Sequence, residues 1–375
     1  MMSTTNSRLR VLVAGGYGYF GTLIAAALAD DPGVSVIVAG RNSERARHTA
    51  ERLGCEHAAL DTGAMNLEPE LARAHVDLVV DATGAFTGTD YQLARAALAA
   101  GASYIDISDS RRHVCNISKL DAQARDRGLL VVAGASSVPT LSAAVIDAHL
   151  AEFAELHRVA YGISASELTP GNAAVTSVLG YCGRSIPGYD KARHVTRTGW
   201  QGSRLIRFNK PLGRRWLARC DVPDLSLFPE RYPTLRSMEF RAGVAMLPSM
   251  MGLWVLSWLV RLRLLRSAAP FSERLRRWAG WLEPLGAGRS GMYVAMSGVD
   301  KRSRPLHRSW QLIATHNHGP RVAAMGAVAL VRKIVRCGLP ASGAFAGAAD
   351  LITLKDYLNE LNGLHIEVFN DGSIA

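Results

Sequence analysis

Short apolar runs alternate with longer amphipathic or alanine-rich segments over the first 133 residues of the chain. Short β-prone runs predict strands, and apolar residues three or four positions apart predict helices. Alternating strands and helices form a parallel sheet with helices on both faces, so the pattern predicts a doubly wound Rossmann domain of about six strands. We expect strands at 10–14, 34–39, 56–60, 76–81, 103–107 and 129–133, and helices at 20–29, 43–53, 67–74, 89–100 and 117–127.

The pattern changes near residue 150, where the alternation of strands and helices ends. β-prone stretches such as 157–164 follow without intervening helical segments, which indicates that a second domain begins here. Near the C-terminus, the alanine- and glycine-rich segment 319–335 predicts a long helix that packs closely against its neighbours.

A glycine-rich turn joins the first expected strand to the first expected helix. Gly16, Gly18 and Gly21 have the spacing G-x-G-x-x-G, with Tyr17, Tyr19 and Phe20 between them. In a dinucleotide-binding domain, the first glycine permits a tight turn and the second lets the backbone approach the pyrophosphate. The third lets the helix pack closely on the strand, and the free N–H groups of its first turn face the anion. Because a strand precedes and a helix follows, we interpret residues 16–21 as a dinucleotide-binding turn, with a purely structural glycine turn as the alternative.

The end of the second expected strand indicates which dinucleotide is bound. An acidic residue there would hold the ribose 2′-hydroxyl of NAD, but residues 39–45 read Ala-Gly-Arg-Asn-Ser-Glu-Arg. Arg41 and Ser43, together with Arg45, offer donors to a 2′-phosphate, which favours NADP over NAD. The alternative is that Arg41 is an ordinary solvated residue at the start of a helix.

Two later positions are further candidates for contact with the cofactor. Asp61, just past the third strand, either accepts a hydrogen bond from the adenine amino group or caps a turn. Thr83 and Gly84, in the run 81–86 after the fourth strand, lie where small residues let the chain pass along a dinucleotide.

Length and composition are those of a globular protein with two domains, because the chain has 375 residues, 48% apolar and 20% charged. Its five cysteines are odd in number and form no C-x-x-C pair, so neither a disulfide framework nor a zinc site is indicated. Residues 1–10 are polar, and no secretory signal is expected. A cytoplasmic location fits these features best.

Positive charge is concentrated in one part of the chain. Residues 200–310 contain 20 Lys and Arg against 7 Asp and Glu, whereas the rest contains 23 against 25. All seven tryptophans lie in the same segment. Because no RNA- or DNA-binding motif accompanies it, we expect a membrane surface or an anionic substrate as partner, and no nucleic acid.

Five motifs in order resemble the saccharopine dehydrogenase-like oxidoreductases, a family that includes the reductase of lysine metabolism, polyamine-pathway enzymes and trans-acting enoyl reductases. They are Gly15-Gly-Tyr-Gly-Tyr-Phe-Gly21, Ala39-Gly-Arg41, Asp81-Ala-Thr-Gly84, Gly101-Ala-Ser-Tyr-Ile-Asp106, and Gly134 followed by Ser137-Val-Pro-Thr-Leu-Ser142. The resemblance covers roughly the first 150 residues and is looser beyond. Where family members often read Pro-Gly-Leu, this chain reads Pro139-Thr-Leu141, which removes a flexible residue near the expected nicotinamide end.

The resemblance implies three parts in the chain. Residues 1–150 are expected to form an NADP-binding Rossmann domain, and residues 151–315 an α+β domain with a mixed sheet that contacts the substrate. Residues 316–375 are expected to form C-terminal helices that pack back on the Rossmann domain.

Two apolar segments in the basic region resemble membrane-associated helices. Residues 244–260 carry no charge and precede a cluster of arginines, but a helix of 17 residues reaches only about 26 Å, short of a hydrocarbon core of about 30 Å. The next segment, 270–282, is amphipathic, with Phe271, Leu275, Trp278 and Leu282 on one face and Arg274, Arg276 and Arg277 elsewhere. We predict that residues 244–282 lie on an anionic membrane surface without spanning it. A helix pair buried within the domain or at a homodimer contact is the alternative.

No motif identifies the catalytic groups. Hydride transfer requires the cofactor, a positioned substrate and usually one proton donor or acceptor. Candidates by residue type alone are Tyr104, Asp106, Tyr161, Tyr181, His316 and His318. No third ligand accompanies the two histidines, so no metal site is predicted.

The leading hypothesis is an NADP(H)-dependent oxidoreductase that acts on a small hydrophobic carbonyl, enoyl or imine substrate. The alternative is a catalytically silent NADP-binding protein that docks on a membrane or a protein partner. Amino-acid substrates would require arginines that converge on carboxylates, and a sequence alone does not show convergence, so the substrate class stays open.

Overall fold

In a computed structural model of the chain, the described residues are 8–84, 86, 88–166, 172–282 and 286–371. The chain forms two compact units, one of residues 1–140 and 323–360, the other of residues 141–322 and 361–375. The first boundary follows residue 140 and not residue 150 as expected, because helix α7 (Ser142–Leu150) belongs to the second unit.

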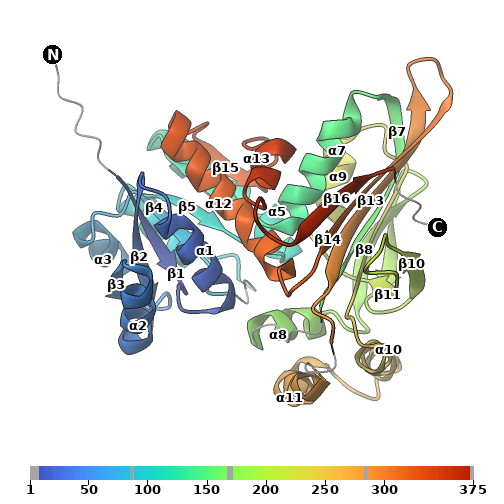
Figure 1. The fold of residues 1–375 in the computed structure, drawn as a ribbon, viewed down its shortest axis with the longest axis horizontal. Coiled ribbons are helices and arrows are strands. Elements are labelled where there is room, and N and C mark those ends of the chain that lie inside the picture. Colours follow the sequence, from blue (N-terminus) through green and yellow to red (C-terminus); the bar gives the residue numbers. More distant parts are fainter. Residues whose placement is uncertain (1–7, 85, 87, 167–171, 283–285, 372–375) are drawn as a thin grey trace. The chain divides into compact units, whose positions relative to one another are not determined.

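The first unit contains a seven-stranded sheet in the order β15-β6-β5-β4-β1-β2-β3 (Figure 1). Every pair of neighbours is parallel, and the strand order reverses at β1, which lies between β2 and β4. This arrangement confirms the predicted Rossmann sheet. The strands are β1 (Leu9–Ala14), β2 (Val34–Gly40), β3 (Glu56–Ala59), β4 (Leu78–Asp81), β5 (Ser103–Asp106), β6 (Leu130–Ala133) and β15 (Gly343–Ala346).

The seventh strand of this sheet was not predicted. β15 has the sequence Gly-Ala-Phe-Ala, which is too short and too poor in β-branched residues to show a strand pattern. It pairs with β6 from Gly343 opposite Leu130 to Ala346 opposite Ala133. Tertiary pairing therefore creates a strand that local propensity does not indicate.

The helices of the first unit follow the predicted positions closely, except that the expected helix 117–127 divides into a 3₁₀ turn and a short helix. The motif Pro139-Thr-Leu141 lies within an irregular helical turn, Ser137–Leu141. The other helical elements of this unit include α1 (Tyr19–Ala29), α2 (Ser43–Leu53), α3 (Leu67–Arg73), α4 (Gln92–Ala99), α5 (Arg111–Cys115), the 3₁₀ turn Ile117–Leu120, α6 (Asp121–Asp126) and α13 (Leu354–Asn359).

Helix α12 (Gly319–Cys337) is the long helix that the sequence predicts near residues 319–335. From Ala323 onwards it belongs to the first unit. A Cβ atom at Gly326 would lie 2.6 Å from the carbonyl oxygen of Ala135, so glycine is required for this close approach. The expected return of the chain to the Rossmann domain is thus made by residues 323–360.

The second unit is built on a nine-stranded mixed sheet, as the family resemblance implies. β12 runs parallel to β7, and the other described neighbours are antiparallel. The path β10-β11-β12-β7-β13-β14-β16 carries the hairpin β8-β9 at β12. The strands are β7 (Phe153–Ser164), β8 (Ser185–Asp190), β9 (Arg193–Thr198), β10 (Arg204–Arg207), β11 (Arg214–Arg219), β12 (Ser237–Gly243), β13 (Ser290–Asp300), β14 (Pro305–Ala314) and β16 (Ile366–Asn370).

The last strand corrects the expectation that all of residues 316–375 pack on the Rossmann domain. β16 pairs with β14, from Ile366 opposite Ala314 to Asn370 opposite Trp310, so residues 361–371 belong to the second unit. The backbone hydrogen bonds of this pair hold the segment in the second sheet.

Helices cover parts of the second sheet. Tyr161 of β7 packs against Phe228 of α9, with ring centroids 5.7 Å apart. Asp147 of α7 accepts hydrogen bonds from Arg231, at the end of α9, and from Tyr232, which follows it. The helices are α7, α8 (Asn172–Gly180), α9 (Asp224–Arg231), α10 (Leu247–Arg261), the 3₁₀ turn Ala269–Phe271 and α11 (Ser272–Leu282). Among the described residues, no helix is long and apolar enough to cross a membrane.

Candidate functional site

The glycine turn of the first unit links β1 directly to α1. Gly15 has a φ of +71°, and the N–H of Gly18 donates to the carbonyl oxygen of Gly15 at 2.8 Å, which closes the turn. A Cβ atom at Gly21 would lie only 2.1 Å from the same oxygen, so the helix can start here only with glycine at this position. The motif thus has the strand, turn and helix context that dinucleotide binding requires.

One detail of the turn differs from the prediction. The left-handed residue is Gly15, whereas Gly16 is packed against the carbonyl oxygen of Val13 and the side chain of Val38, 2.8 and 3.0 Å from where its Cβ atom would be. The signal that could have revealed this is the double glycine at the end of the strand, because only one of the two can make the turn.

Backbone N–H groups at the start of α1 are the candidate anion-binding part of the turn. Gly18 is the N-cap residue, and no side chain caps the helix there. The turn lies at the carboxyl end of β1, where the strand order reverses. This is the position at which open α/β sheets bind the pyrophosphate of a dinucleotide.

Residues 40–43 at the end of β2 include Arg41 and no acid, as predicted for NADP, and Glu44 follows in the first turn of α2. Arg41, Ser43 and Arg45 are exposed, and Asn42 caps α2 by accepting from the N–H of Arg45 at 2.9 Å. The structure adds Tyr17, whose hydroxyl oxygen accepts from the N–H of Asn42 at 3.0 Å. These groups form a donor-rich surface of the kind that a 2′-phosphate requires.

Tyr17 connects the glycine turn to the basic end of β2. The Arg45 guanidinium lies 4.7 Å from the centre of the Tyr17 ring, a cation–π distance. A Cβ atom at Gly40 would lie 2.4 Å from Cε1 of Tyr17, so the ring covers the end of β2 closely. Tyr19 and Phe20 follow at the start of α1, with their rings edge to face at 5.2 Å.

The remaining cofactor candidates also lie at carboxyl ends of strands of this sheet. Asp61 is exposed, and its Oδ1 accepts from the N–H of Gly63 at 3.1 Å, so it makes the turn that was one of its two predicted roles. The N–H and hydroxyl of Thr83 donate to Oδ1 of Asp81 at 2.9 and 2.7 Å. Gly84 has a φ of +76°, a conformation that favours glycine.

A buried polar network lies behind this edge and contains two of the catalytic candidates. The Tyr104 hydroxyl donates to Oδ2 of Asp81 at 3.0 Å, and Asp106 accepts from the N–H groups of Ser108 and Gly134, each at 2.9 Å. Tyr104 is 2% exposed and Asp106 is fully buried. In this structure neither side chain is open to a substrate.

His113 completes this network, and sequence reasoning missed it. Its Nε2 lies 2.8 Å from Oδ2 of Asp106, and its Nδ1 lies 3.2 Å from the carbonyl oxygen of Gly88. Burial lowers the pKa of His113, but the hydrogen bond and charge of Asp106 outweigh it, so the pKa of this imidazole is raised overall. Both ring nitrogens face acceptors, which an imidazolium with two N–H donors satisfies.

Burial also shifts the partners of this network toward their protonated forms. It raises the pKa of the Asp81 carboxyl, against the hydrogen bonds from Thr83. It raises the pKa of Tyr104 well above its ordinary value, with the charges of Asp81 and Asp106 acting in the same direction. Burial therefore favours the protonated forms of Asp81 and Tyr104 in the interior of the first unit.

Thr140 gives a physical reason for the departure from Pro-Gly-Leu. Its hydroxyl donates to the carbonyl oxygen of Gly134 at 2.7 Å and accepts from the N–H of Ala348 at 2.8 Å. The side chain is fully buried. It ties the loop after β6 to the loop after β15, which a glycine at this position would not do.

In the second unit, His316 and His318 lie beside a third histidine that was not predicted. The centre of the His365 ring lies 4.1 Å from that of His316 and 5.2 Å from that of His318. The backbone N–H of His365 donates to Nδ1 of His318 at 2.9 Å. Burial, followed by the charge of Arg321, lowers the pKa of His318. Among the described residues, no group of three potential ligands is arranged to hold a metal ion.

A buried carboxyl group occupies the interior of the second unit. Asp224 in the first turn of α9 accepts a hydrogen bond from the hydroxyl of Ser142, and burial raises its pKa to about 7. The catalytic candidate Tyr161 is fully buried nearby among Phe228 and Phe240, whereas Tyr181 is half-buried.

Arginines from four strands line a cavity of about 250 Å³ in the second unit. Glu239 pairs with Arg204 and with the fully buried Arg241, both at 3.0 Å. In the described part of the chain, the Arg219 guanidinium has no carboxylate partner, and burial followed by the charge of Arg241 lowers its pKa. The cavity can therefore bind a carboxylate or phosphate. The lining arginines are Arg158, Arg197, Arg204 and Arg219.

The parallel sheet and its glycine turn have the fold of the dinucleotide-binding domains of dehydrogenases. Residues 11–132 match the family model of the saccharopine dehydrogenase NADP binding domain. Among solved structures, the chain is similar to apo saccharopine dehydrogenase (L-Glu forming) from Saccharomyces cerevisiae, with 14% identity and a TM-score of 0.65 over 97% of this chain and 100% of that one. The family model supports, over residues 11–132, the saccharopine dehydrogenase-like family that the sequence motifs resemble, and the solved structure shows that the two chains share a fold.

Two other solved structures are less similar. A probable dehydrogenase from Thermotoga maritima is 11% identical, with a TM-score of 0.48 over 94% of this chain and 93% of that one. A myo-inositol dehydrogenase from Corynebacterium glutamicum is 13% identical, with a TM-score of 0.47 over 94% and 93%. No curated protein sequence matches the chain.

Proposed function

We propose that the protein is an NADP(H)-dependent oxidoreductase that transfers hydride to or from a small hydrophobic carbonyl, enoyl or imine substrate in the cytoplasm. The observation that carries this proposal is the glycine turn within a domain that matches an NADP-binding family. Tyr17 joins this turn to the end of β2, where residues 40–43 include Arg41 and no acid. The nicotinamide ring, when bound, supplies the hydride chemistry.

Each part of the cofactor has a corresponding group in the first unit. The N–H groups at the start of α1 bind the pyrophosphate, and the glycines keep side chains out of its path. Arg41, Ser43 and Arg45 hold the 2′-phosphate, and Asp61 lies at the adenine. Thr83 and Gly84 line the path toward the nicotinamide. The proton donor or acceptor of the reaction is not assigned to a residue.

A substrate with a carboxylate or phosphate group is a second candidate. The specific observation in its favour is the cavity of the second unit, where Arg219 has no carboxylate partner within the described residues. Binding of an acidic substrate requires arginines that converge on its carboxylate or phosphate. The sequence alone did not show which arginines converge.

A turnover assay tests these proposals. NADPH oxidation should occur with at least one member of a panel of hydrophobic keto, enoyl and imine compounds, and the reverse reaction with the matching product. If only acidic compounds react, Arg219→Gln should raise their KM, whereas Arg214→Gln on the same strand should not. Tight NADPH binding without turnover of any compound would instead favour a catalytically silent cofactor-binding protein.

A further inference from the structure

Helix α10 has an inner face that is firmly attached to the second unit. Met250, Ser257 and Val260 are buried, and the Ser257 hydroxyl donates to the carbonyl oxygen of Gly199 at 2.9 Å. A Cβ atom at Gly183 would lie 2.3 Å from the carbonyl oxygen of Ser257, so the helix backbone approaches this loop as closely as glycine allows. The position of α10 on the unit is therefore fixed by packing and hydrogen bonds.

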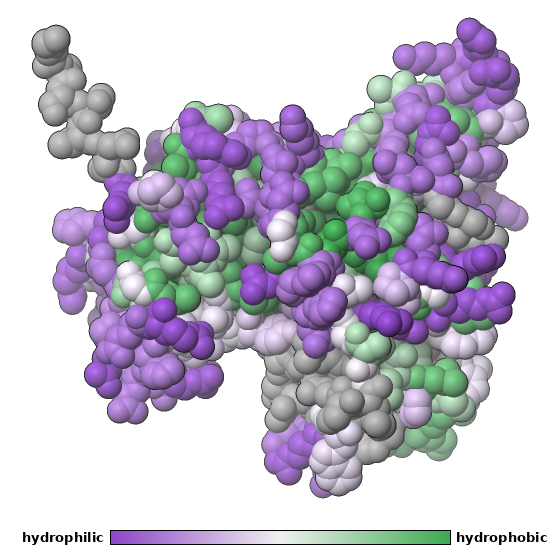
Figure 2. Space-filling model, in the orientation of Figure 1, coloured by the Kyte–Doolittle hydropathy of each residue, from purple (hydrophilic) through white to green (hydrophobic). Residues whose placement is uncertain are grey.

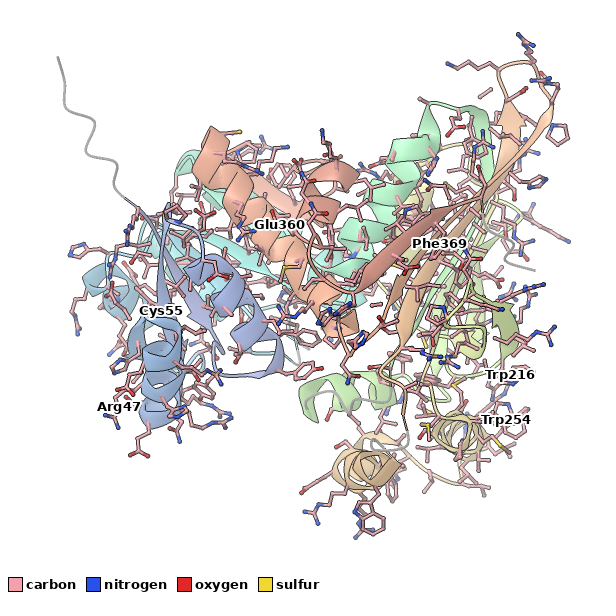
Figure 3. All side chains as sticks on the ribbon, in the orientation of Figure 1. Arg47, Cys55, Trp216, Trp254, Glu360 and Phe369 are labelled. Carbon is pink, nitrogen blue, oxygen red and sulfur yellow. The ribbon has the colours of Figure 1, made fainter. Side chains whose placement is uncertain are left out.

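The outer face of the same helix is apolar and exposed. Figure 2 shows hydrophobic residues gathered over α10, and Figure 3 shows Trp254 projecting away from the helix. The exposed side chains recur at helical spacing, and two of them, Trp254 and Trp258, contact each other edge to face at 6.3 Å. The stripe consists of Leu247 (53% exposed), Met251 (57%), Trp254 (44%), Val255 (48%), Trp258 (38%) and Leu262 (60%). A contiguous apolar stripe of this kind marks an interaction surface.

A basic groove of about 850 Å³ adjoins the end of this helix. None of the described residues that line it is acidic. Arg261 donates to Oγ1 of Thr198 at 2.9 Å and to Oε1 of Gln201 at 2.8 Å, which are neutral acceptors, and its guanidinium lies 5.5 Å from the Trp258 ring centre. The polar groups that line the groove are Arg184, Ser185, Thr196, Arg197, Thr198, Arg261, Arg263 and Arg266.

The charge of this groove is largely uncompensated within the protein. In the part of the chain that the structure describes, Arg197 pairs with Asp190 at 3.3 Å, and no ion pair involves Arg184, Arg261, Arg263 or Arg266. Guanidinium groups beside hydroxyls bind phosphate oxygens well. The groove thus offers a phosphate site next to an apolar stripe.

We propose that the stripe and the groove together form a docking surface for a bilayer of anionic phospholipids. The stripe enters the boundary between headgroups and acyl chains, with its tryptophans at headgroup depth, and the groove holds lipid phosphates. This surface is narrower than the predicted segment 244–282 and also includes residues 184–185 and 196–198, which the sequence did not indicate. The side chains of Trp278 and Leu282 in α11 lie outside the described residues, while Trp281 is 81% exposed.

The charges and the apolar groups together favour a bilayer over other partners. A nucleic acid would satisfy the arginines but would leave Leu247, Met251 and Val255 without an apolar partner. A second copy of the chain, related by a two-fold axis, would bring the arginines of two grooves toward each other without acids to compensate them. An anionic bilayer satisfies both features at once.

The test uses the full chain, flotation with vesicles of phosphatidylcholine alone or mixed equally with phosphatidylglycerol, and circular dichroism to check folding. The intact protein should float with the anionic vesicles only. Trp254→Ser/Trp258→Ser should abolish flotation. Leu247→Ser/Met251→Ser should weaken flotation, and this second variant serves as the test if the first does not fold. Met65→Ser/Leu339→Ser, which removes exposed apolar groups elsewhere, should not change it.

The groove is tested by Arg261→Gln/Arg263→Gln/Arg266→Gln. Each basic residue near an anionic surface contributes about 1 kcal/mol, so binding should weaken about a hundredfold. Lys301→Gln/Arg302→Gln/Arg336→Gln removes the same charge from other exposed positions and should have a much smaller effect. The proposal is overturned if the intact protein stays soluble with anionic vesicles or if both triple variants weaken binding equally. It is also overturned if Trp254→Ser/Trp258→Ser dissociates a homodimer but leaves flotation unchanged. Because no cofactor enters the assay, these outcomes are independent of the proposed oxidoreductase activity.

Discussion

The candidate anion sites of the two units are built from different groups. In the first unit, the candidate pyrophosphate site is made of backbone N–H groups within the contiguous segment 15–21. In the second unit, the basic cavity and groove are made of arginine side chains from strands and helices far apart in the sequence. One candidate site thus uses neutral backbone groups, and the others use positively charged side chains.

The free-energy penalty of forming the two kinds of candidate anion site also differs. Backbone N–H groups at a helix start are neutral and are held by the helix itself, so they require only glycines that leave space. Arginines that converge repel one another and lose hydration, as the lowered pKa of Arg219 indicates. The second unit compensates part of this charge with Glu239 beside the buried Arg241.

The largest expected effect is on the backbone site. Gly18 has a φ of −78°, which other residues also adopt, and its added Cβ atom would lie 3.0 Å from the carbonyl oxygen of Gly15. Gly18→Val should therefore fold, but its side chain would occupy the pyrophosphate position and NADPH binding should fall below detection in a fluorescence titration. Gly180→Val, where no atom lies within 4 Å of the added Cβ, is the control. Unchanged affinity in a cooperatively melting Gly18→Val variant would refute this placement.

The next effect concerns the buried carboxyl of the second unit and its dependence on pH. The pKa of Asp224 is about 7 when folded against an ordinary 3.8, so the folded state keeps a proton that the unfolded state loses between these values. The contribution of Asp224 to the free energy of unfolding should therefore be greatest below about pH 4 and should decrease by about 4 kcal/mol as the pH rises to 7. Asp224→Asn should remove this part of the pH dependence in urea unfolding.

The matched control for this prediction is Asp126→Asn, at an exposed carboxyl of the first unit. It should leave the pH dependence of unfolding as it is in the natural protein. If Asp224→Asn and the natural protein lose stability equally between pH 4 and 7, Asp224 does not hold a proton in the folded state.

The smallest effect discriminates between NADPH and NADH in the first unit. Arg41→Ala should weaken NADPH by about 1.5–3 kcal/mol, the range for a hydrogen bond to a charged group, and should change NADH little. Arg47→Ala, on the helix α2 that follows Arg41 and further from the strand end, is the control (Figure 3). Equal losses for both cofactors would remove Arg41 from the 2′-phosphate site.

The sequence by itself determined the Rossmann core of this protein. Apolar runs, helix-stopping glycines and the glycine turn are all encoded within a few neighbouring residues, so the strands β1 to β6 and most helices between them were predicted with small differences in their ends. The basic end of β2 was also read directly, because Arg41 and Ser43 follow the strand in the chain. Short-range steric and hydrophobic patterns are sufficient for these features.

Tertiary structure alone decided which distant residues meet. The tetrapeptide of β15 became a strand only because β6 offered a partner, and β16 joined the second sheet beside β14. His365 lies beside His318, and arginines from β7, β9, β10 and β11 line one cavity. Both arrangements result from strand pairings that no local pattern indicates. The physical reason is that register between strands depends on packing of the whole sheet, whereas a turn or a helix depends on its own residues.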